Sequence, residues 1–230
     1  LRPSRGAGRT ADDRRMAAGR GVRVLTTTAL AAGALLLTRR MTQTWGTWEG
    51  EHECVLPGDD LVPDARAVVA TRAVTVDAPP ADVWPWLVQL GQGRGGFYSY
   101  DALENLVGLG IRSADAIEER WQGLAVGDDV HLADEAVLRV AALEPGSHLV
   151  LLGAPGPGQP ATMPFRFSWA FVVRPLPPGA DGTPRSRLLV RERYVPLGAA
   201  GRVVVEAVQP VSFLMTQKML RGVRDRAERP

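Results

Sequence analysis

The chain has 230 residues, of which 45% are hydrophobic, so it is long and apolar enough for one sizeable domain with an appendage. Its net charge of +2 is unevenly spread: residues 1–40 hold nine arginines against Asp12 and Asp13, so this head carries roughly +7 and the remainder roughly −5. Because a nucleic-acid-binding domain gathers its basic charge within the fold, this distribution argues against a nucleic-acid partner.

The first 41 residues divide into a basic stretch and a hydrophobic one. Residues 1–21 are predicted to be disordered or untranslated; if Met16 is the true start, the untranslated part is residues 1–15. Residues 22–41 contain the uncharged run Val24–Thr38 with arginines on both sides. As a helix, that run spans roughly 22 Å, short of the roughly 30 Å hydrocarbon core, although flanking arginines can close part of the gap.

Three interpretations of residues 22–41 remain open. We expect a single-pass membrane anchor, which makes the membrane a partner and the cell membrane the location. A cleaved secretory signal matches the apolar length, but no small-residue cleavage site follows the run. A buried helix of a cytoplasmic protein is the third interpretation.

Residues 42–66 are predicted to be a linker. They are rich in Trp, Gly, Glu and Pro and include the turn-forming cluster Leu56–Asp60. A folded domain is then predicted over residues 67–228.

The domain is predicted to open with a strand and a helix. From Thr71 the residues alternate as in a strand, until Pro79 and Pro80 end it and preset a helix start. Gly91 is the expected cap at the end of this helix. A second, short helix is predicted over Tyr100–Val107. The apolar stripe of the first helix consists of Val83, Trp86, Leu87 and Leu90.

Several extended segments and a long helix follow. The segment Phe165–Phe171 places four aromatic rings on one face by strict alternation. The other strands are expected at Val130–Leu132, Val137–Leu143, Leu149–Leu152 and Leu188–Tyr194. The closing helix is expected to begin near Pro210. Its predicted apolar stripe consists of Val208, Val211, Met215, Met219 and Val223. Consecutive strands between helices indicate an α+β fold.

Three stretches of the chain resemble a known family. The run Asp77–Trp84 (DAPPADVW), which leads into the first helix, and the order of elements are similar to the START-like, or SRPBCC, superfamily of helix-grip proteins. The runs Leu56–Pro63 and Gly91–Asn105 resemble an uncharacterised bacterial branch of it. The resemblance covers about residues 45–226. It implies a curved antiparallel sheet wrapped around the C-terminal helix, with a hollow between them for a lipid, a polyketide or another hydrophobic small molecule.

The candidate ligand-binding residues come from this expected hollow. The glycine- and tyrosine-rich run Gly91–Asn105 is expected to shape its mouth, because glycine allows tight turns and tyrosine gives a rigid wall. Arg94 could meet an anionic head group there or be solvated, and Asp101 could instead cap the short helix. The candidates are Arg94, Phe97, Tyr98, Tyr100, Asp101, Asn105, Phe167, Trp169, Glu192, Met215 and Met219.

The sequence predicts neither a metal nor a cofactor. The three histidines are far apart, and the glycine run follows a helix instead of opening one, which excludes a dinucleotide loop. No complete catalytic set is present, so we expect non-catalytic binding. The alternative is an enzyme of the cyclase, aromatase or dehydratase type, with Tyr98, Tyr100 and either Asp101 or Glu192 in acid–base roles.

Overall fold

The computed structural model describes residues 33–229 except residues 107, 109, 135 and 154–162. It divides into two compact units, Leu1–Met41 and Thr42–Pro230. In the first unit residues 33–41 are helical, whereas residues 1–21 and residues 22–32 of the predicted anchor lie outside the described residues. Over the described residues, no helix is both long and apolar enough to cross a bilayer.

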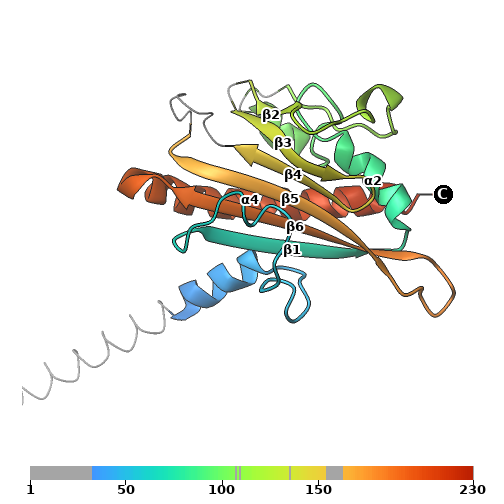
Figure 1. Ribbon diagram of the computed structural model, residues 1–230, viewed down its shortest axis with the longest axis horizontal. Helices are drawn as coiled ribbons and strands as arrows, with labels where there is room; N and C mark the ends of the chain where they lie inside the picture. Colours follow the sequence, from blue (N-terminus) through green and yellow to red (C-terminus); the bar gives the residue numbers. More distant parts are fainter. Residues whose placement is uncertain (1–32, 107, 109, 135, 154–162, 230) are drawn as a thin grey trace, which may run out of the picture. The chain divides into compact units, whose positions relative to one another are not determined.

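The second unit is an α+β domain built on one six-stranded antiparallel sheet. The strands lie side by side in the order β1-β6-β5-β4-β3-β2, so the first strand pairs with the last and the others follow as hairpins (Figure 1). Their bounds are β1 Val68–Val76, β2 Asp129–Ala133, β3 Ala136–Glu144, β4 His148–Gly153, β5 Phe165–Leu176 and β6 Arg185–Pro196. All five strand segments predicted from alternation after residue 129 are confirmed, and each is longer than predicted.

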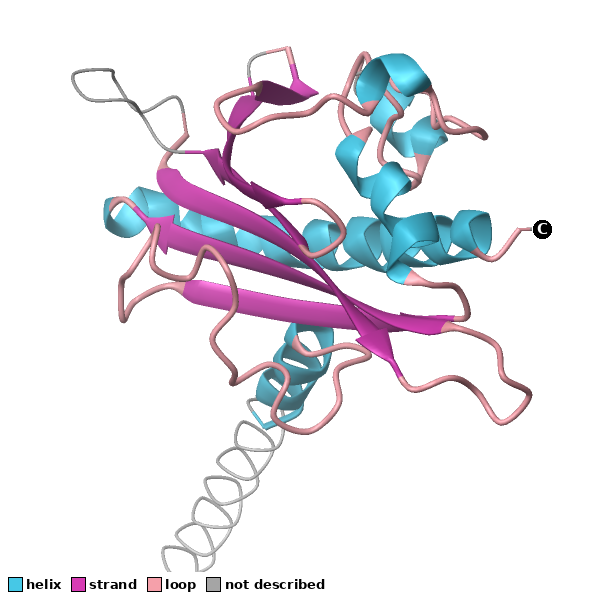
Figure 2. Cartoon of the chain, turned by 45° about the vertical axis from the view of Figure 1, so that its right-hand side comes forward, coloured by secondary structure: helices cyan, strands magenta, loops and turns pink. Residues whose placement is uncertain are grey.

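In the described part of the domain, three helices and a short 3-10 turn accompany the sheet. They are α2 Pro80–Val88, α3 Asp101–Leu106, η1 Glu119–Trp121 and α4 Gly198–Ala227. The helix α4 runs along one face of the twisted sheet (Figure 2). A curved antiparallel sheet with a long C-terminal helix on one face is the predicted helix-grip fold class, which is thus confirmed. The helix covers an apolar face of the sheet that would otherwise be exposed to water.

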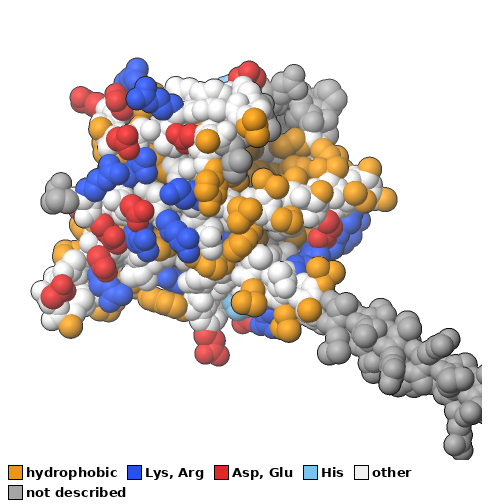
Figure 3. Space-filling view, turned by 180° about the vertical axis from the view of Figure 1, so that it is seen from behind, with side chains coloured by type: hydrophobic (Ala, Val, Ile, Leu, Met, Phe, Trp, Pro, Cys, Tyr) orange, Lys and Arg blue, Asp and Glu red, His pale blue; other side chains and the backbone are white. Residues whose placement is uncertain are grey.

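The helix α4 begins twelve residues before the predicted start at Pro210, which lies inside it. The proline costs one backbone hydrogen bond there, but helices tolerate such a loss where tertiary packing holds both sides. The predicted apolar stripe is also shifted, because Val211 is exposed. Several hydrophobic side chains of α4 are exposed: Val203, Val204, Val211 and Leu214. Figure 3 shows hydrophobic side chains gathered on the face of the molecule that is seen from behind.

Both faces of the central strands are buried. Leu188, Val190 and Tyr194 of β6 join the main core on the α4 side, while Leu189 joins a smaller core on the opposite face with Leu56. Successive side chains of a strand point to opposite faces of the sheet, so neighbouring residues enter different cores. A second layer must therefore cover the face away from α4.

Residues 42–66 form that second layer, which corrects their prediction as a linker. They cross the face of the sheet opposite α4 (Figure 1), and Leu56 and Val62 are buried there. Two ion pairs fasten the segment to β6: Arg187 with Glu51 at 2.6 Å, and Arg191 with Asp59 at 2.5 Å. Both arginine side chains are 4% exposed, so the segment is an integral part of the domain.

Candidate functional site

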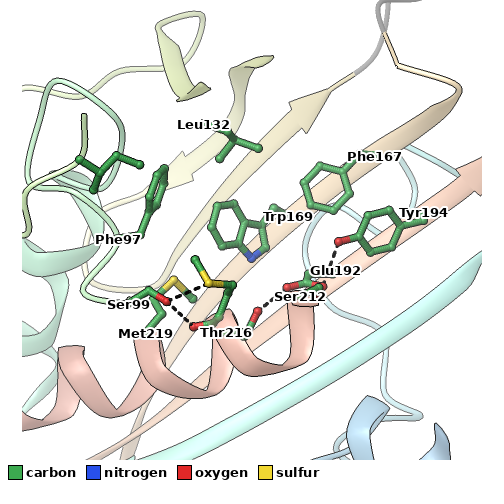
Figure 4. Close-up of a pocket in the computed structure, with 12 residues that line it drawn as sticks. Phe97, Ser99, Leu132, Phe167, Trp169, Glu192, Tyr194, Ser212, Thr216 and Met219 are labelled. Carbon is green, nitrogen blue, oxygen red and sulfur yellow. Dashed lines mark hydrogen bonds between the residues drawn. The ribbon is translucent and has the colours of Figure 1, made fainter. Parts of the chain in front are cut away.

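A cavity of about 200 Å³ lies between β5, β6 and α4 (Figure 4). Most of its walls are aromatic or aliphatic, and its polar side-chain groups are one carboxylate, one phenol, one indole N–H and three hydroxyls. Its lining consists of Phe97, Ser99, Ile111, Leu132, Phe167, Trp169, Glu192, Tyr194, Ser212, Met215, Thr216 and Met219.

The sheet side of the cavity is aromatic. Alternation along β5 turns Phe167 and Trp169 to the α4 face, with ring centroids 6.4 Å apart. Tyr194 on β6 is the cross-strand partner of Phe167, and their ring centroids are 4.6 Å apart. The three rings support one another in tilted contacts, which fixes the shape of this wall.

The helix side of the cavity comes from one stripe of α4. Ser212, Met215, Thr216 and Met219 are spaced three and four residues apart and therefore share a face. The two methionines supply unbranched side chains that adapt to guests of different shape. The two hydroxyl groups bring polarity to the same stripe.

The third side comes from the loop that precedes α3. Phe97 and Ser99 line the cavity, and the Ser99 hydroxyl donates to the Met215 carbonyl at 3.1 Å. Between them Tyr98 has a φ of +54°, which reverses the chain against α4. Gly222 makes this approach possible, because a Cβ there would lie 2.3 Å from the Tyr98 carbonyl oxygen.

One end of the cavity is polar and centred on Glu192. Its carboxylate forms an ion pair with Arg72 at 3.2 Å, and the two side chains are 4% and 1% exposed. Thr216 donates a hydrogen bond to Oε1 at 2.5 Å, Tyr194 donates to Oε2 at 3.1 Å, and Ser212 also donates to Oε2. Opposite charge and hydroxyl donors together make the buried carboxylate tolerable.

Two side chains near Glu192 differ in whether their polar group has a hydrogen-bond partner. Burial, and then the negative charge of Glu192, raises the pKa of Tyr194 well above 10, so its hydroxyl stays protonated and neutral. The indole Nε1 of Trp169 is buried and has no hydrogen-bond partner among the described residues. A buried tryptophan N–H normally has a partner, so this donor needs an explanation.

Six of the predicted site residues line the cavity together: Phe97, Phe167, Trp169, Glu192, Met215 and Met219. The other five lie outside the lining. Arg94 is half-buried and donates to the carbonyls of Val88 at 2.8 Å and Trp121 at 2.9 Å, and burial lowers its pKa. Its guanidinium therefore fastens α2 to η1 instead of facing an anionic group.

Of the remaining four, Tyr98, Asp101 and Asn105 hold the loop together by hydrogen bonds, whereas Tyr100 does not. The Tyr98 hydroxyl accepts from Gln89 and donates to the Trp86 carbonyl at 3.1 Å, while Tyr100 is 39% exposed. Asp101 accepts from the backbone N–H and the hydroxyl of Ser113, at 2.7 and 2.6 Å. Asn105 holds both backbone groups of Ile111. The glycine- and tyrosine-rich run thus positions Phe97, Ser99 and Ile111, and most of its own polar groups are used internally.

Six lining residues were not predicted: Ser99, Ile111, Leu132, Tyr194, Ser212 and Thr216. Tyr194 had a usable signal, because it shares a strand face with Glu192. Ser212 and Thr216 also had one, since they flank Met215 and Met219 at helical spacing. Ser99 and Ile111 had none, because the direction of Ser99 depends on the backbone at Tyr98 and that of Ile111 on its hydrogen bonds with Asn105.

The described residues contain no group of three or more His, Cys, Asp and Glu side chains that could hold a metal. The carboxylate of Glu192 forms an ion pair with Arg72, whose positive charge opposes the binding of a cation there.

The comparisons with known proteins give matches only among solved structures; no family model and no curated protein matches the chain. One similar structure is protein MLL2253 from Mesorhizobium loti, with 17% identity and a TM-score of 0.37, covering 70% of this chain and 96% of that one. Another is norcoclaurine synthase from Thalictrum flavum, with 15% identity and a TM-score of 0.39, covering 70% and 91%. A third is Ara h 8.0201, with 15% identity and a TM-score of 0.40, covering 70% and 97%.

Proposed function

We propose that this helix-grip domain binds a hydrophobic small molecule in the cavity between its sheet and α4, without transforming it. The observation that carries the proposal is the cavity of about 200 Å³ with predominantly aromatic and aliphatic walls. An engineered apolar cavity of about 150 Å³ accepts benzene. The volume here therefore matches a substituted single ring, or a short length of a lipid's hydrocarbon chain.

The expected affinity follows from the area of such a guest. Burying roughly 200 Å² of ring surface at about 25 cal/mol per Å² contributes about 5 kcal/mol before the costs of association. Polar contacts at the Glu192 end add to this. We expect dissociation constants in the micromolar to millimolar range, which sets the concentrations for a titration.

The enzymatic alternative has less support. It needs acid–base groups around one bound substrate, but Tyr98, Tyr100 and Asp101 lie outside the cavity lining. Glu192 lines the cavity, yet Arg72 and three hydroxyl groups already engage its carboxylate. We therefore propose binding alone.

The proposal is tested by blocking the cavity from β2. Leu132 lines it, whereas His131 is exposed on the opposite face of the same strand. We expect the wild-type chain and His131→Trp to bind ethylbenzene saturably in ligand-observed NMR. Leu132→Trp should weaken that binding at least about tenfold, because the indole fills the guest volume. Absence of saturable binding to the wild type, or equal binding to both variants, contradicts the proposal.

A further inference from the structure

We propose that the guest carries a hydroxyl group, as a phenol or an alcohol does, and that this group bridges Trp169 and Glu192. The hydroxyl oxygen accepts from the indole Nε1 and its proton is donated to the carboxylate. This inference rests on the proposed binding function and narrows it to one chemical class.

The first observation is the donor without a partner. Trp169 is 8% exposed and lines the cavity, and its Nε1 is buried with no hydrogen-bond partner among the described residues. Figure 4 shows this nitrogen on the side of the indole that faces Glu192 and α4. Because a buried N–H without an acceptor is costly, a guest that supplies an acceptor at this point gains affinity.

The second observation is the remaining capacity of Glu192. Its Oε2 takes part in the ion pair with Arg72 and accepts from two hydroxyl groups, but its Oε1 accepts one hydrogen bond, from Thr216. A carboxylate oxygen can accept two hydrogen bonds. Oε1 therefore has room for one further donor.

The third observation is that these two residues lie side by side on neighbouring strands. Trp169 and Glu192 are register partners on β5 and β6. Side chains directly opposite each other in an antiparallel pair have Cβ atoms about 5 Å apart and lie on the same face. One small group can therefore reach both, and a hydroxyl is at once a donor and an acceptor.

Other polar groups fit the pair less well. A guest carboxylate brings a second negative charge beside Glu192, whose counter-ion Arg72 is already engaged. An ammonium group offers no lone pair to the indole N–H, and a ketone or ether offers no proton to the carboxylate. A hydrocarbon satisfies neither group. Among these groups, the hydroxyl is the one that satisfies both.

The test compares two ligands that differ by one oxygen, using the full chain. We expect 4-ethylphenol to bind about tenfold more tightly than ethylbenzene, which corresponds to about 1.4 kcal/mol. In Trp169→Phe, which keeps a ring but loses the N–H, the affinity for 4-ethylphenol should fall several-fold relative to ethylbenzene. Trp121→Phe, outside the cavity lining, is the matched control and should leave both affinities unchanged.

A second readout does not depend on the variant's affinity. In the ¹H–¹⁵N spectrum, the indole signal that Trp169→Phe removes should move downfield when the wild type binds 4-ethylphenol, and less so with ethylbenzene. Equal affinities for the two ligands, an unmoved indole signal, or tighter binding of 4-ethylbenzoate overturns the hydroxyl assignment while the binding function stands. Failure of both ligands to bind the wild type overturns the binding function as well.

Discussion

At the scale of single residues, the ion pair of Arg72 and Glu192 carries a large desolvation cost. Both side chains are almost completely removed from water, and the carboxylate sits at one end of an otherwise apolar cavity. Desolvation of two charges is offset by their mutual attraction and by the hydroxyl donors around Glu192. Removing one partner leaves the other charge buried alone.

We therefore predict that Glu192→Leu lowers the free energy of unfolding by about 3–5 kcal/mol. The double variant Arg72→Met with Glu192→Leu should recover most of this loss, because it leaves no uncompensated charge. Urea denaturation of the three proteins measures both effects. If the double variant is as unstable as Glu192→Leu, an isolated Arg72 is not the cause of the loss.

The tyrosines give a prediction of pH dependence. Burial is the main reason that the pKa values of Tyr98 and Tyr194 are raised above 10, and the charge of Glu192 adds to the effect at Tyr194. The folded state thus holds both protons more tightly than the unfolded state. The resulting stability is complete below the unfolded pKa of about 10 and is lost as pH rises above it, by up to about 1.4 kcal/mol per pH unit for each tyrosine.

Ultraviolet absorbance of the phenolate during an alkaline titration checks this, because the chain has three tyrosines. We expect at most one to ionise while the protein remains folded by circular dichroism. The other two should ionise together with unfolding. Ionisation of two or more phenols in the folded protein near pH 10 contradicts the burial of Tyr98 and Tyr194.

At the scale of the elements, alternation and helical spacing predict most of the domain. The strict alternation of Phe165–Phe171 predicts β5 and the face that carries Phe167 and Trp169, because only one face of a strand can hold all four rings. The same reasoning places Glu192 and Tyr194 on one side of β6. Local patterns are sufficient to predict a strand or helix that packs only against an apolar core.

Local patterns are insufficient to predict the structure where contacts with residues distant in the sequence determine it. Residues 42–66 have a turn-rich composition typical of a linker, yet Arg187 and Arg191 bind Glu51 and Asp59 across more than 130 residues of sequence. Similarly, Tyr98 and Asp101 look like pocket residues, but Gln89 and Ser113 occupy their hydrogen-bonding groups. Neither pairing leaves a trace in the spacing of nearby residues.

The attachment of residues 42–66 can be tested at Asp59. Its carboxylate binds Arg191 and accepts from the backbone N–H of Leu56 at 2.9 Å. We predict that Asp59→Ala costs about 3 kcal/mol of unfolding free energy, since the Arg191 side chain stays buried without its partner. Hydrogen exchange should also become faster at the Leu56 amide.

The matched control is Asp60→Ala, at the neighbouring exposed position. It should change the stability by less than about 0.5 kcal/mol. Equal effects of the two substitutions are incompatible with a segment that is fastened to β6 through Asp59.

At the scale of the whole molecule, the two faces of the sheet are packed in different ways. On one face residues 42–66 are fastened by ion pairs and a small apolar core. On the other face α4 packs against β1, β5 and β6 but leaves the cavity between β5, β6 and its Ser212–Met219 stripe. The ion-paired segment supports one face of the sheet. The proposed binding function belongs to the cavity on the other face.

The most direct test of this account is a crystal of the protein under xenon pressure, because xenon enters dry apolar cavities of about 150 Å³. We predict a xenon atom among Phe97, Leu132 and Met219, at the apolar end of the cavity and away from Glu192 (Figure 4). Side chains packed solidly through that space, with no xenon between α4 and the sheet, would contradict the cavity and the binding function inferred from it.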